Sequence, residues 1–229
     1  MSNCLLCDSE MKQPLTWNVL ILNKEENVCK TCRDLLQLLT GETCCICGRV
    51  LHDDFREGEM CSDCIRWEQD PEWRGILKRN VSLFHYNEFL KETIAKFKYR
   101  GDYAIASAFS FYINAVLQKM EFDLLVPVPL SSERLFERGF NQAEALAKCA
   151  GFSCTDILAR MHSEKQSKKS RKERMIIAKI FQVKSPDFVV GKNILLLDDI
   201  YTTGSTIRNA AKELRLAGVS SVQSFTLAR

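Results

Sequence analysis

Four cysteine pairs with the spacing C-x-x-C lie within the first 64 residues, and they restrict what this chain can fold into more than any other feature. Two thiolates separated by two residues curl around one ion, and two such pairs complete a tetrahedral shell of four sulfurs. Because protein ligands then fill every position of each shell, the sequence predicts two structural zinc ions. The predicted ligands are Cys4, Cys7, Cys29, Cys32, Cys44, Cys47, Cys61 and Cys64.

The cysteine pairs can combine in two ways. Sequential pairing makes one ribbon from the first two pairs and another from the last two, and a cross-braced arrangement is the alternative. Cys45 stands beside a predicted ligand and is interpreted as a spare thiol, and Cys149 and Cys154 lie much later in the chain. His52 either replaces a cysteine ligand or lies in an exposed loop. In a secreted protein eleven cysteines would suggest disulfides, but this clustering is typical of metal binding in a reducing compartment.

Charge divides the chain into two unlike parts. Residues 1–68 carry seven Lys or Arg and twelve Asp or Glu, so the remainder of a chain with net charge +3 carries +8. The acidic part is poorly suited to gripping phosphates, which favours a protein partner for it. No run of about 18 apolar residues occurs, and the first residues lack the layout of a signal peptide. We therefore expect a cytoplasmic protein without membrane insertion.

After residue 80 the pattern becomes an alternation of strands and helices. Apolar strands are predicted over 81–86, 124–128, 193–197 and 219–227, and helices over 88–99, 103–119, 141–150 and 206–216. This alternation predicts an α/β fold with a parallel sheet flanked by helices. The predicted organisation is a double zinc-ribbon module at 1–68, a linker at 69–80 and the α/β domain at 81–229. Residues 160–179, with eight Lys or Arg, are predicted to form a mobile loop.

An acidic pair followed by a hydroxyl-rich turn is the most informative segment of the second part. The apolar run 194–197 delivers Asp198 and Asp199 at the end of a strand, where ligands of open α/β sheets bind. A turn with hydroxyls and a glycine then leads into a helix, whose first amides form a cup for phosphate. The turn residues are Thr202, Thr203, Gly204, Ser205 and Thr206. No lysine stands there, which excludes a Walker A loop. The alternatives are that Asp198 and Asp199 only cap the strand, or that they resemble the acid pair of a receiver domain. Neither alternative explains the hydroxyls of the turn.

This segment resembles the signature of type I phosphoribosyltransferases. The resemblance implies that Asp198 and Asp199 hold the ribose hydroxyls of 5-phosphoribosyl 1-pyrophosphate, that the turn holds its 5-phosphate, and that Mg2+ accompanies the ligand. It also implies a pyrophosphate site after the strand at 124–128, formed by Pro129, Leu130, Ser131, Arg134 and Arg138. The alternative interpretation is that these two arginines are surface charges at the start of a helix. Lys98 and Arg100 either face the ligand or stabilise the end of a helix.

The order of motifs along nearly the whole chain is similar to that of ComF family proteins. After the cysteine pairs come K-Y-R-G-D, V-P-V-P-L, R-G-F-N-Q, E-K-Q-S-K-K-S and L-L-L-D-D-I-Y-T-T-G-S-T. The resemblance implies a role in competence, the uptake of single-stranded DNA, alongside a ComFA-like ATP-dependent translocase. One departure is Ile177, where many relatives carry asparagine three residues after the arginine of the basic loop.

Three functions follow from these patterns. The first is binding of phosphoribosyl pyrophosphate with Mg2+, with or without transfer to an acceptor. The second is binding of single-stranded DNA through the basic loop residues Lys165, Lys168, Lys169, Arg171 and Arg174. Phe84, Tyr86, Tyr99 and Phe140 are candidates for stacking on bases, although such aromatics are often core residues. The third is a phosphoribosyltransferase of nucleotide salvage, whose acceptor the sequence does not identify.

Overall fold

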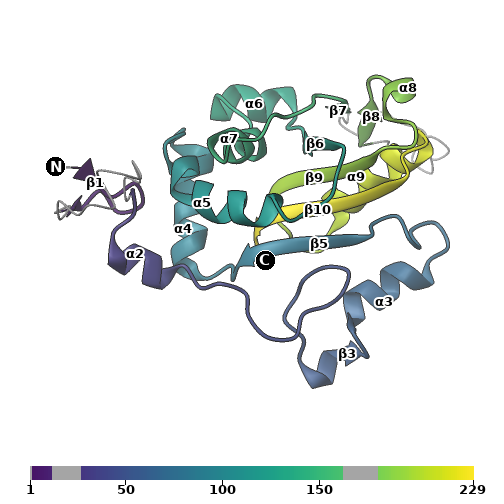
Figure 1. Ribbon diagram of the computed structural model, residues 1–229, viewed down its shortest axis with the longest axis horizontal. Helices are drawn as coiled ribbons and strands as arrows, with labels where there is room; N and C mark the ends of the chain where they lie inside the picture. Colours follow the sequence, from purple (N-terminus) through teal and green to yellow (C-terminus); the bar gives the residue numbers. More distant parts are fainter. Residues whose placement is uncertain (1, 12–26, 162–179) are drawn as a thin grey trace, which may run out of the picture.

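The computed structural model describes residues 2–11, 27–161 and 180–229, and it centres on a four-stranded parallel sheet (Figure 1). The strands lie in the order β5 (Arg79–Phe84), β10 (Ser221–Ala228), β9 (Asn193–Ile200) and β6 (Leu124–Pro127). Parallel strands need crossover connections, and the helices between these strands supply them, as predicted. The expected fold class, a parallel sheet flanked by helices behind a cysteine-rich module, is confirmed.

Helices cover both faces of the sheet, and β9 shows why. Leu195 and Leu197 belong to one hydrophobic cluster, with the helices α4 (Glu88–Tyr99), α5 (Ile105–Leu117) and α7 (Gln142–Cys149). Ile194 and Leu196 belong to a second cluster on the other face, with α9 (Ser205–Leu216). Because successive strand residues point to opposite faces, a continuous apolar run such as this one specifies a central strand buried on both sides. None of the helices in the described ranges has the length and apolar character needed to cross a membrane.

Two small elements were not expected from the sequence. α6 (Ser132–Arg138) occupies the segment after β6 that the sequence suggested to be a loop, so Arg134 and Arg138 both stand on a helix. Its seven residues are too few for a clear periodicity, but the Ser131 hydroxyl accepts a hydrogen bond from the Arg134 amide and caps it. The hairpin β7 (Leu158–Arg160) and β8 (Phe181–Val183), followed by α8 (Pro186–Val189), is the other. The loop predicted over 160–179 was wrong at its start, because Arg160 ends β7, and the basic loop residues 165–174 lie outside the described residues.

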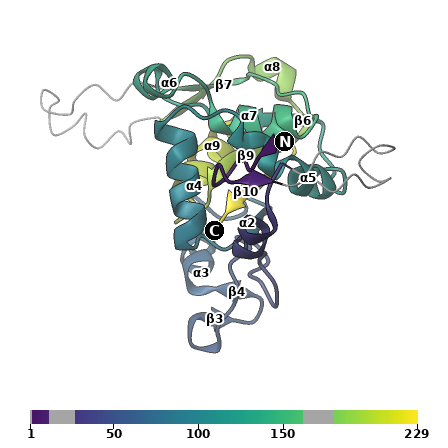
Figure 2. The same ribbon diagram turned by 90° about the vertical axis from the view of Figure 1, so that its left-hand side faces the viewer.

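The two cysteine modules lie at different places on the α/β domain (Figure 2). The first contains β1 (Ser2–Asn3), β2 (Glu10–Met11) and α2 (Lys30–Leu35), and packs beside α4, where the Lys96 amine donates to the Leu6 carbonyl at 3.2 Å. The second contains η1 (Asp53–Phe55), β3 (Arg56–Glu57), β4 (Met60–Cys61) and α3 (Ser62–Gln69). The segment leading into it runs along the outer edge of β5, with the Leu39 amide donating to the Leu83 carbonyl at 2.8 Å.

Hydrophobic packing connects the modules to the sheet. Cys44, Cys47, Cys61 and Cys64 are buried in the same cluster as residues of β6, β9 and α9. The predicted division into domains at residues 69–80 stays a prediction, and part of that segment is tightly packed, since Leu77 is buried and Arg79 already belongs to β5.

The predicted stacking aromatics have different surroundings. Phe84 is fully buried against Phe109 and Tyr112, so its assignment as a stacking residue was wrong. Phe140 is half-buried and packs its ring 5.4 Å from that of Phe97. Only Tyr86 and Tyr99 among the four candidates are exposed. Apolar strand and helix faces recruit aromatic residues for packing, which explains why a sequence pattern cannot separate these two classes.

Candidate functional site

The eight predicted zinc ligands form two groups of four, in the sequential pairing. In each group the four sulfurs lie within 4.8 Å of one another. The sulfurs of Cys7 and Cys29 are 3.8 Å apart and those of Cys47 and Cys61 3.5 Å apart. Two thiolates bound at about 2.3 Å to one tetrahedral zinc are roughly 3.8 Å apart, so both groups fit the ion. Cys45 and His52 belong to neither group.

Backbone and hydroxyl groups support the sulfurs in both tetrads. The Cys29 amide donates to the Cys4 sulfur at 3.3 Å, and the Cys61 amide donates to the Cys44 sulfur at 3.4 Å. A hydrogen bond with the Ser9 hydroxyl lowers the pKa of Cys7 to about 6, which favours the thiolate that a metal requires. The second tetrad is buried throughout, whereas Cys7 of the first is exposed. Each tetrad could hold a zinc ion without an open coordination position.

The acidic pair lies within β9, directly before its last residue. The strand continues three residues further than predicted. Successive residues point to opposite sides of a strand, so the two carboxylates have different partners. Asp199 is ion-paired with Lys98 of α4, with Nζ and Oδ2 2.6 Å apart. Asp198 accepts a hydrogen bond from the Asp199 amide at 2.9 Å. Lys98 therefore does more than stabilise a helix end.

Asp198 titrates near neutral pH. Burial and, to a smaller extent, the neighbouring Asp199 carboxylate together raise its pKa to about 7, whereas Lys98 and Arg160 oppose the shift. A small part of the side chain reaches solvent in a pocket, but protein surrounds most of it. The carboxyl therefore changes from a hydrogen-bond donor to an acceptor within the physiological range.

A tight turn connects the acids to α9. Gly204 has φ +83°, and a Cβ atom there would lie 2.2 Å from the Tyr201 hydroxyl, so both the backbone and the space require glycine. The hydroxyls of Thr203 and Ser205 are 2.9 Å apart, and the four Thr and Ser side chains of the turn are exposed. The first amides of a helix have no acceptors within the helix, and that of Ser205 donates to the Thr203 hydroxyl at 3.3 Å.

A cavity of about 210 Å3 collects predicted residues from the end of β9 and from the segments that follow β6 and β9. Among the predicted residues it is lined by Asp198, Asp199, Thr202, Thr206, Pro129, Leu130, Arg134 and Arg138. Thr203, Gly204 and Ser205 complete the adjoining turn without lining the cavity, and Ser131 caps α6 beside it.

Seven further residues line this cavity, and four of them are polar or charged. These four are Lys98, whose ligand role the sequence left open, Arg160, Asn141 and Gln142. The Asn141 amide donates to the Val128 carbonyl at 2.9 Å, while its oxygen caps α7, which ties that helix to the end of β6. The Gln142 oxygen accepts a hydrogen bond from Arg138 at 2.9 Å. The motif R-G-F-N-Q contained the signal for two of them, but Arg160 comes from a hairpin that the sequence did not indicate.

A parallel α/β sheet, an acid pair at the end of its central strand and a hydroxyl turn before the next helix define a type I phosphoribosyltransferase-like domain, here joined to two cysteine tetrads. The chain belongs to the ComFC family of competence proteins. It is 43% identical to competence protein ComFC of Bacillus subtilis, over 99% of this chain and 94% of the relative. It is 34% identical to competence protein ComFC of Streptococcus pneumoniae, over 99% of both chains.

More distant similarities extend to other proteins. The chain is 26% identical to the DNA utilization protein YhgH of Escherichia coli, over 88% of this chain and 96% of the relative. No family model matches the chain. Among solved structures it is similar to the glutamine phosphoribosylpyrophosphate amidotransferase of B. subtilis, with a TM-score of 0.37 and 22% identity, over 53% of this chain and 26% of that one.

Proposed function

We propose that this protein acts in DNA uptake by binding phosphoribosyl pyrophosphate, or a similar phosphosugar, and single-stranded DNA. The observation that carries the phosphosugar part is the composition of the 210 Å3 cavity. Two carboxylates line it together with four cationic side chains, those of Lys98, Arg134, Arg138 and Arg160. Cations in this number suit a ligand with several phosphates, and carboxylates suit hydroxyls.

Each group has a role in this proposal. Asp198 and Asp199 accept hydrogen bonds from the ribose hydroxyls, and the turn from Thr202 to Thr206 receives the 5-phosphate. Pro129, Leu130 and Ser131, together with Arg134 and Arg138, receive the pyrophosphate. Mg2+ would accompany the phosphates and neutralise part of their charge. Because Lys98 pairs with Asp199 in the free protein, ligand binding has to replace or rearrange this contact.

Calorimetric titration with phosphoribosyl pyrophosphate and Mg2+ tests the site. The native chain should release heat on binding, and Asp198→Asn with Asp199→Asn should abolish it. Asp53→Asn with Asp54→Asn is the matched control, since it also neutralises two adjacent acids, of which Asp53 is exposed and paired only loosely with Arg56 at 3.9 Å. Equal binding by the acid-pair variant and the control would refute the assignment.

Family membership and charge support the nucleic-acid part of the proposal. The chain beyond residue 68 carries +8, and the basic residues between 165 and 174 add phosphate contacts. We expect affinity for single-stranded DNA to fall steeply with salt, and a ComFA-like translocase to be the protein partner. Affinity that does not change with salt would contradict an electrostatic contact.

Transfer of the phosphoribosyl group to an acceptor is a second candidate. The four cations of the cavity favour it, because they would stabilise pyrophosphate as a leaving group. Pyrophosphate release should be measured with free nucleobases and with single-stranded DNA as acceptors. Release with a free base would favour a salvage enzyme, and release only with DNA would favour a DNA-modifying activity.

A further inference from the structure

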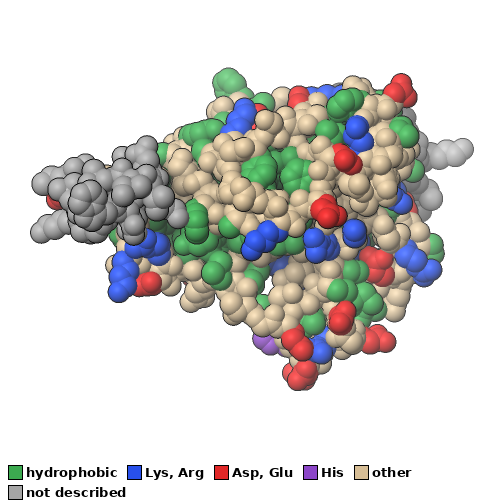
Figure 3. All heavy atoms as spheres, in the orientation of Figure 1, with side chains coloured by type: hydrophobic (Ala, Val, Ile, Leu, Met, Phe, Trp, Pro, Cys, Tyr) green, Lys and Arg blue, Asp and Glu red, His purple; other side chains and the backbone are tan. Residues whose placement is uncertain are grey.

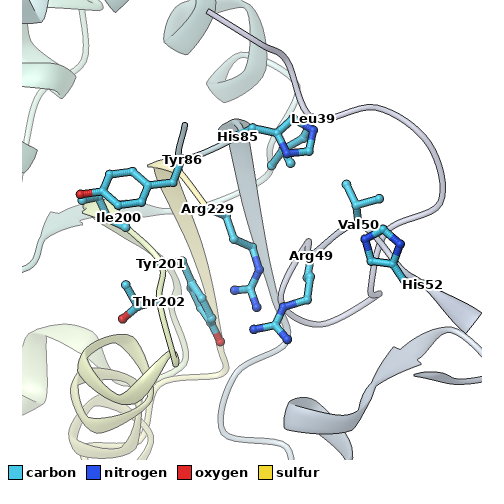
Figure 4. Close-up of a pocket in the computed structure, with 10 residues that line it drawn as sticks. All are labelled: Leu39, Arg49, Val50, His52, His85, Tyr86, Ile200, Tyr201, Thr202 and Arg229. Carbon is cyan, nitrogen blue, oxygen red and sulfur yellow. The ribbon is translucent and has the colours of Figure 1, made fainter. Parts of the chain in front are cut away.

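A second cavity, of about 340 Å3, lies between the second cysteine module and the carboxyl ends of β5, β9 and β10 (Figure 4). The module contributes Arg49, Val50 and His52, with Leu39 from the segment before it, and the strand ends contribute the rest. The strand-end residues are His85, Tyr86, Ile200, Tyr201, Thr202 and Arg229. Ile200 and Thr202 also line the 210 Å3 cavity proposed to bind the phosphosugar, so the two cavities flank the end of β9.

Two guanidinium groups give this cavity a positive wall. Figure 4 shows those of Arg49 and Arg229 pointing in the same direction from opposite sides of the module boundary. Arg49 is paired with Asp63 at 2.8 Å. Arg229 lies over the Tyr201 ring at 4.5 Å, and its Nε and Nη1 are buried with no hydrogen-bond partner among the described residues. Buried donors without acceptors are costly, and a nearby anion would relieve them.

The cationic side chain in contact with the second cysteine tetrad is Arg208, not Arg49 or Arg229. Arg208 of α9 is fully buried, with Nη2 3.9 Å from the Cys64 sulfur and Nη1 3.1 Å from Glu68, so the second tetrad already has a close cationic partner. Attraction to Arg229 partly offsets the raised pKa of Cys47, and Arg229 forms no ion pair with a carboxylate among the described residues. Arg49 shares its charge with Asp63, so Arg229, whose Nε and Nη1 have no partner, is the group of this pair with the greater remaining capacity for an anion.

Aromatic and apolar surfaces complete the cavity. Tyr86 is 41% exposed and stands on one side, and Leu39 and Val50 line the other. Tyr86 lines the same cavity as the two guanidinium groups, and an exposed tyrosine ring suits a nucleobase, which stacks on the ring while its phosphate reaches toward the cations. On the face shown in Figure 3, Lys and Arg side chains also lie along the boundary between the module and the α/β domain.

We propose that this junction cavity binds one nucleotide, with its phosphate on Arg49 and Arg229 and its base on Tyr86. The inference deepens the nucleic-acid part of the proposed function and rests on it, whereas the phosphosugar part is independent. The nucleotide is either free or one unit of a single strand. Its position beside Ile200 and Thr202 places it next to the phosphosugar ligand.

Two measurements on the full zinc-loaded chain test the proposal. Fluorescence anisotropy measures binding of a labelled oligothymidine of about 15 nucleotides, and calorimetry measures binding of thymidine monophosphate. Arg49→Gln with Arg229→Gln should weaken oligonucleotide binding at least about tenfold. The control variant Lys91→Gln with Lys119→Gln removes the same charge from exposed positions outside the cavity. It should change the affinity for the oligonucleotide less than about threefold. Monophosphate binding to the native chain identifies a free nucleotide as a ligand, and oligonucleotide binding alone identifies a strand.

A second pair of variants tests whether the Tyr86 ring stacks on a nucleobase. Tyr86→Phe should keep oligonucleotide affinity within about twofold, and Tyr86→Leu should lower it about five- to tenfold, because only the former keeps a face for stacking. Zinc content and phosphosugar binding should stay unchanged in every variant. Equal loss in the arginine variant and the lysine control, or no binding of either probe by the native chain, would overturn the proposal. Phosphosugar heat in the same samples shows whether the other site has failed too.

Discussion

Asp198 carries the strongest prediction at the scale of single residues. Its pKa is raised from the value of 3.8 expected in an unfolded chain to about 7, so the folded protein holds its proton more tightly. As pH rises from about 4 to about 7, ionisation of this buried carboxyl therefore costs stability, and above about 7 the full cost is present. Asp198→Asn should raise the free energy of unfolding by roughly 1–3 kcal/mol at about pH 8 and by little at about pH 4.

Urea denaturation of both proteins at the two pH values measures this difference. A variant that gains as much stability at the acid end as at the alkaline end would show that the carboxyl is not protonated in the fold. The same titration predicts that affinity for the phosphosugar rises as pH passes through about 7, since only the carboxylate accepts two hydroxyl hydrogen bonds.

Gly204 carries the second prediction at this scale. Gly204→Ala should displace the turn, because the new methyl group meets the Tyr201 ring and hydroxyl at 2.2–2.9 Å, and should weaken phosphosugar binding at least about tenfold. Gly191→Ala is the matched control, since that glycine has φ +72° but no atom within 4 Å of its would-be methyl group. Calorimetry on the two variants separates backbone strain from the clash, and equal binding by both would contradict the clash.

At the scale of elements, α3 of the second module holds the turn before α9. The Trp67 indole donates to the Thr203 carbonyl at 3.3 Å, and its ring lies 5.1 Å from the Arg208 guanidinium. Trp67→Phe removes the N–H but keeps a ring, so phosphosugar affinity should fall by roughly 0.5–1.5 kcal/mol while zinc content stays at its native value. Trp73→Phe, at a neighbouring ring 5.0 Å away, is the control and should leave affinity unchanged.

At the scale of the whole molecule, the two tetrads have different consequences for the sheet. The second shares its hydrophobic cluster with β6, β9 and α9, whereas the first packs beside α4. Elemental analysis should find two zinc ions per chain. Cys64→Ser should remove one ion, lower the melting temperature and weaken phosphosugar binding, because the module supports α9 through Arg208.

Cys7→Ser is the matched change in the first tetrad, at an exposed ligand. It should also remove one zinc ion, but phosphosugar affinity should stay within about twofold of the native value, because none of the described residues of that module lines the cavity. If both variants lose affinity to the same extent, the coupling through α9 is wrong. Metal analysis and calorimetry on the same preparations decide the question.

Sequence patterns were sufficient wherever the physical cause is local. The spacing of the C-x-x-C pairs is itself the geometry of a metal knuckle, and the run from Ile194 to Leu197 can be stable only as a strand covered on both faces. The helix at Glu88–Tyr99 was predicted with its observed limits, because a regular apolar stripe and an Asn87 cap define it. The fold class and the eight sulfur ligands therefore followed from the chain alone, whereas the structure decided how the ligands pair into tetrads.

Tertiary structure decided the contacts between residues far apart in sequence. The Lys98 pair with Asp199, the place of Arg160 in the cavity wall and the burial of Phe84 all depend on which elements pack together, and no local pattern records that. The same holds for the junction cavity, whose walls come from the second module and from three strand ends. Local spacing thus determined the metal ligands and the strands, while the free energy of packing distant segments determined which charges face one another across the sites.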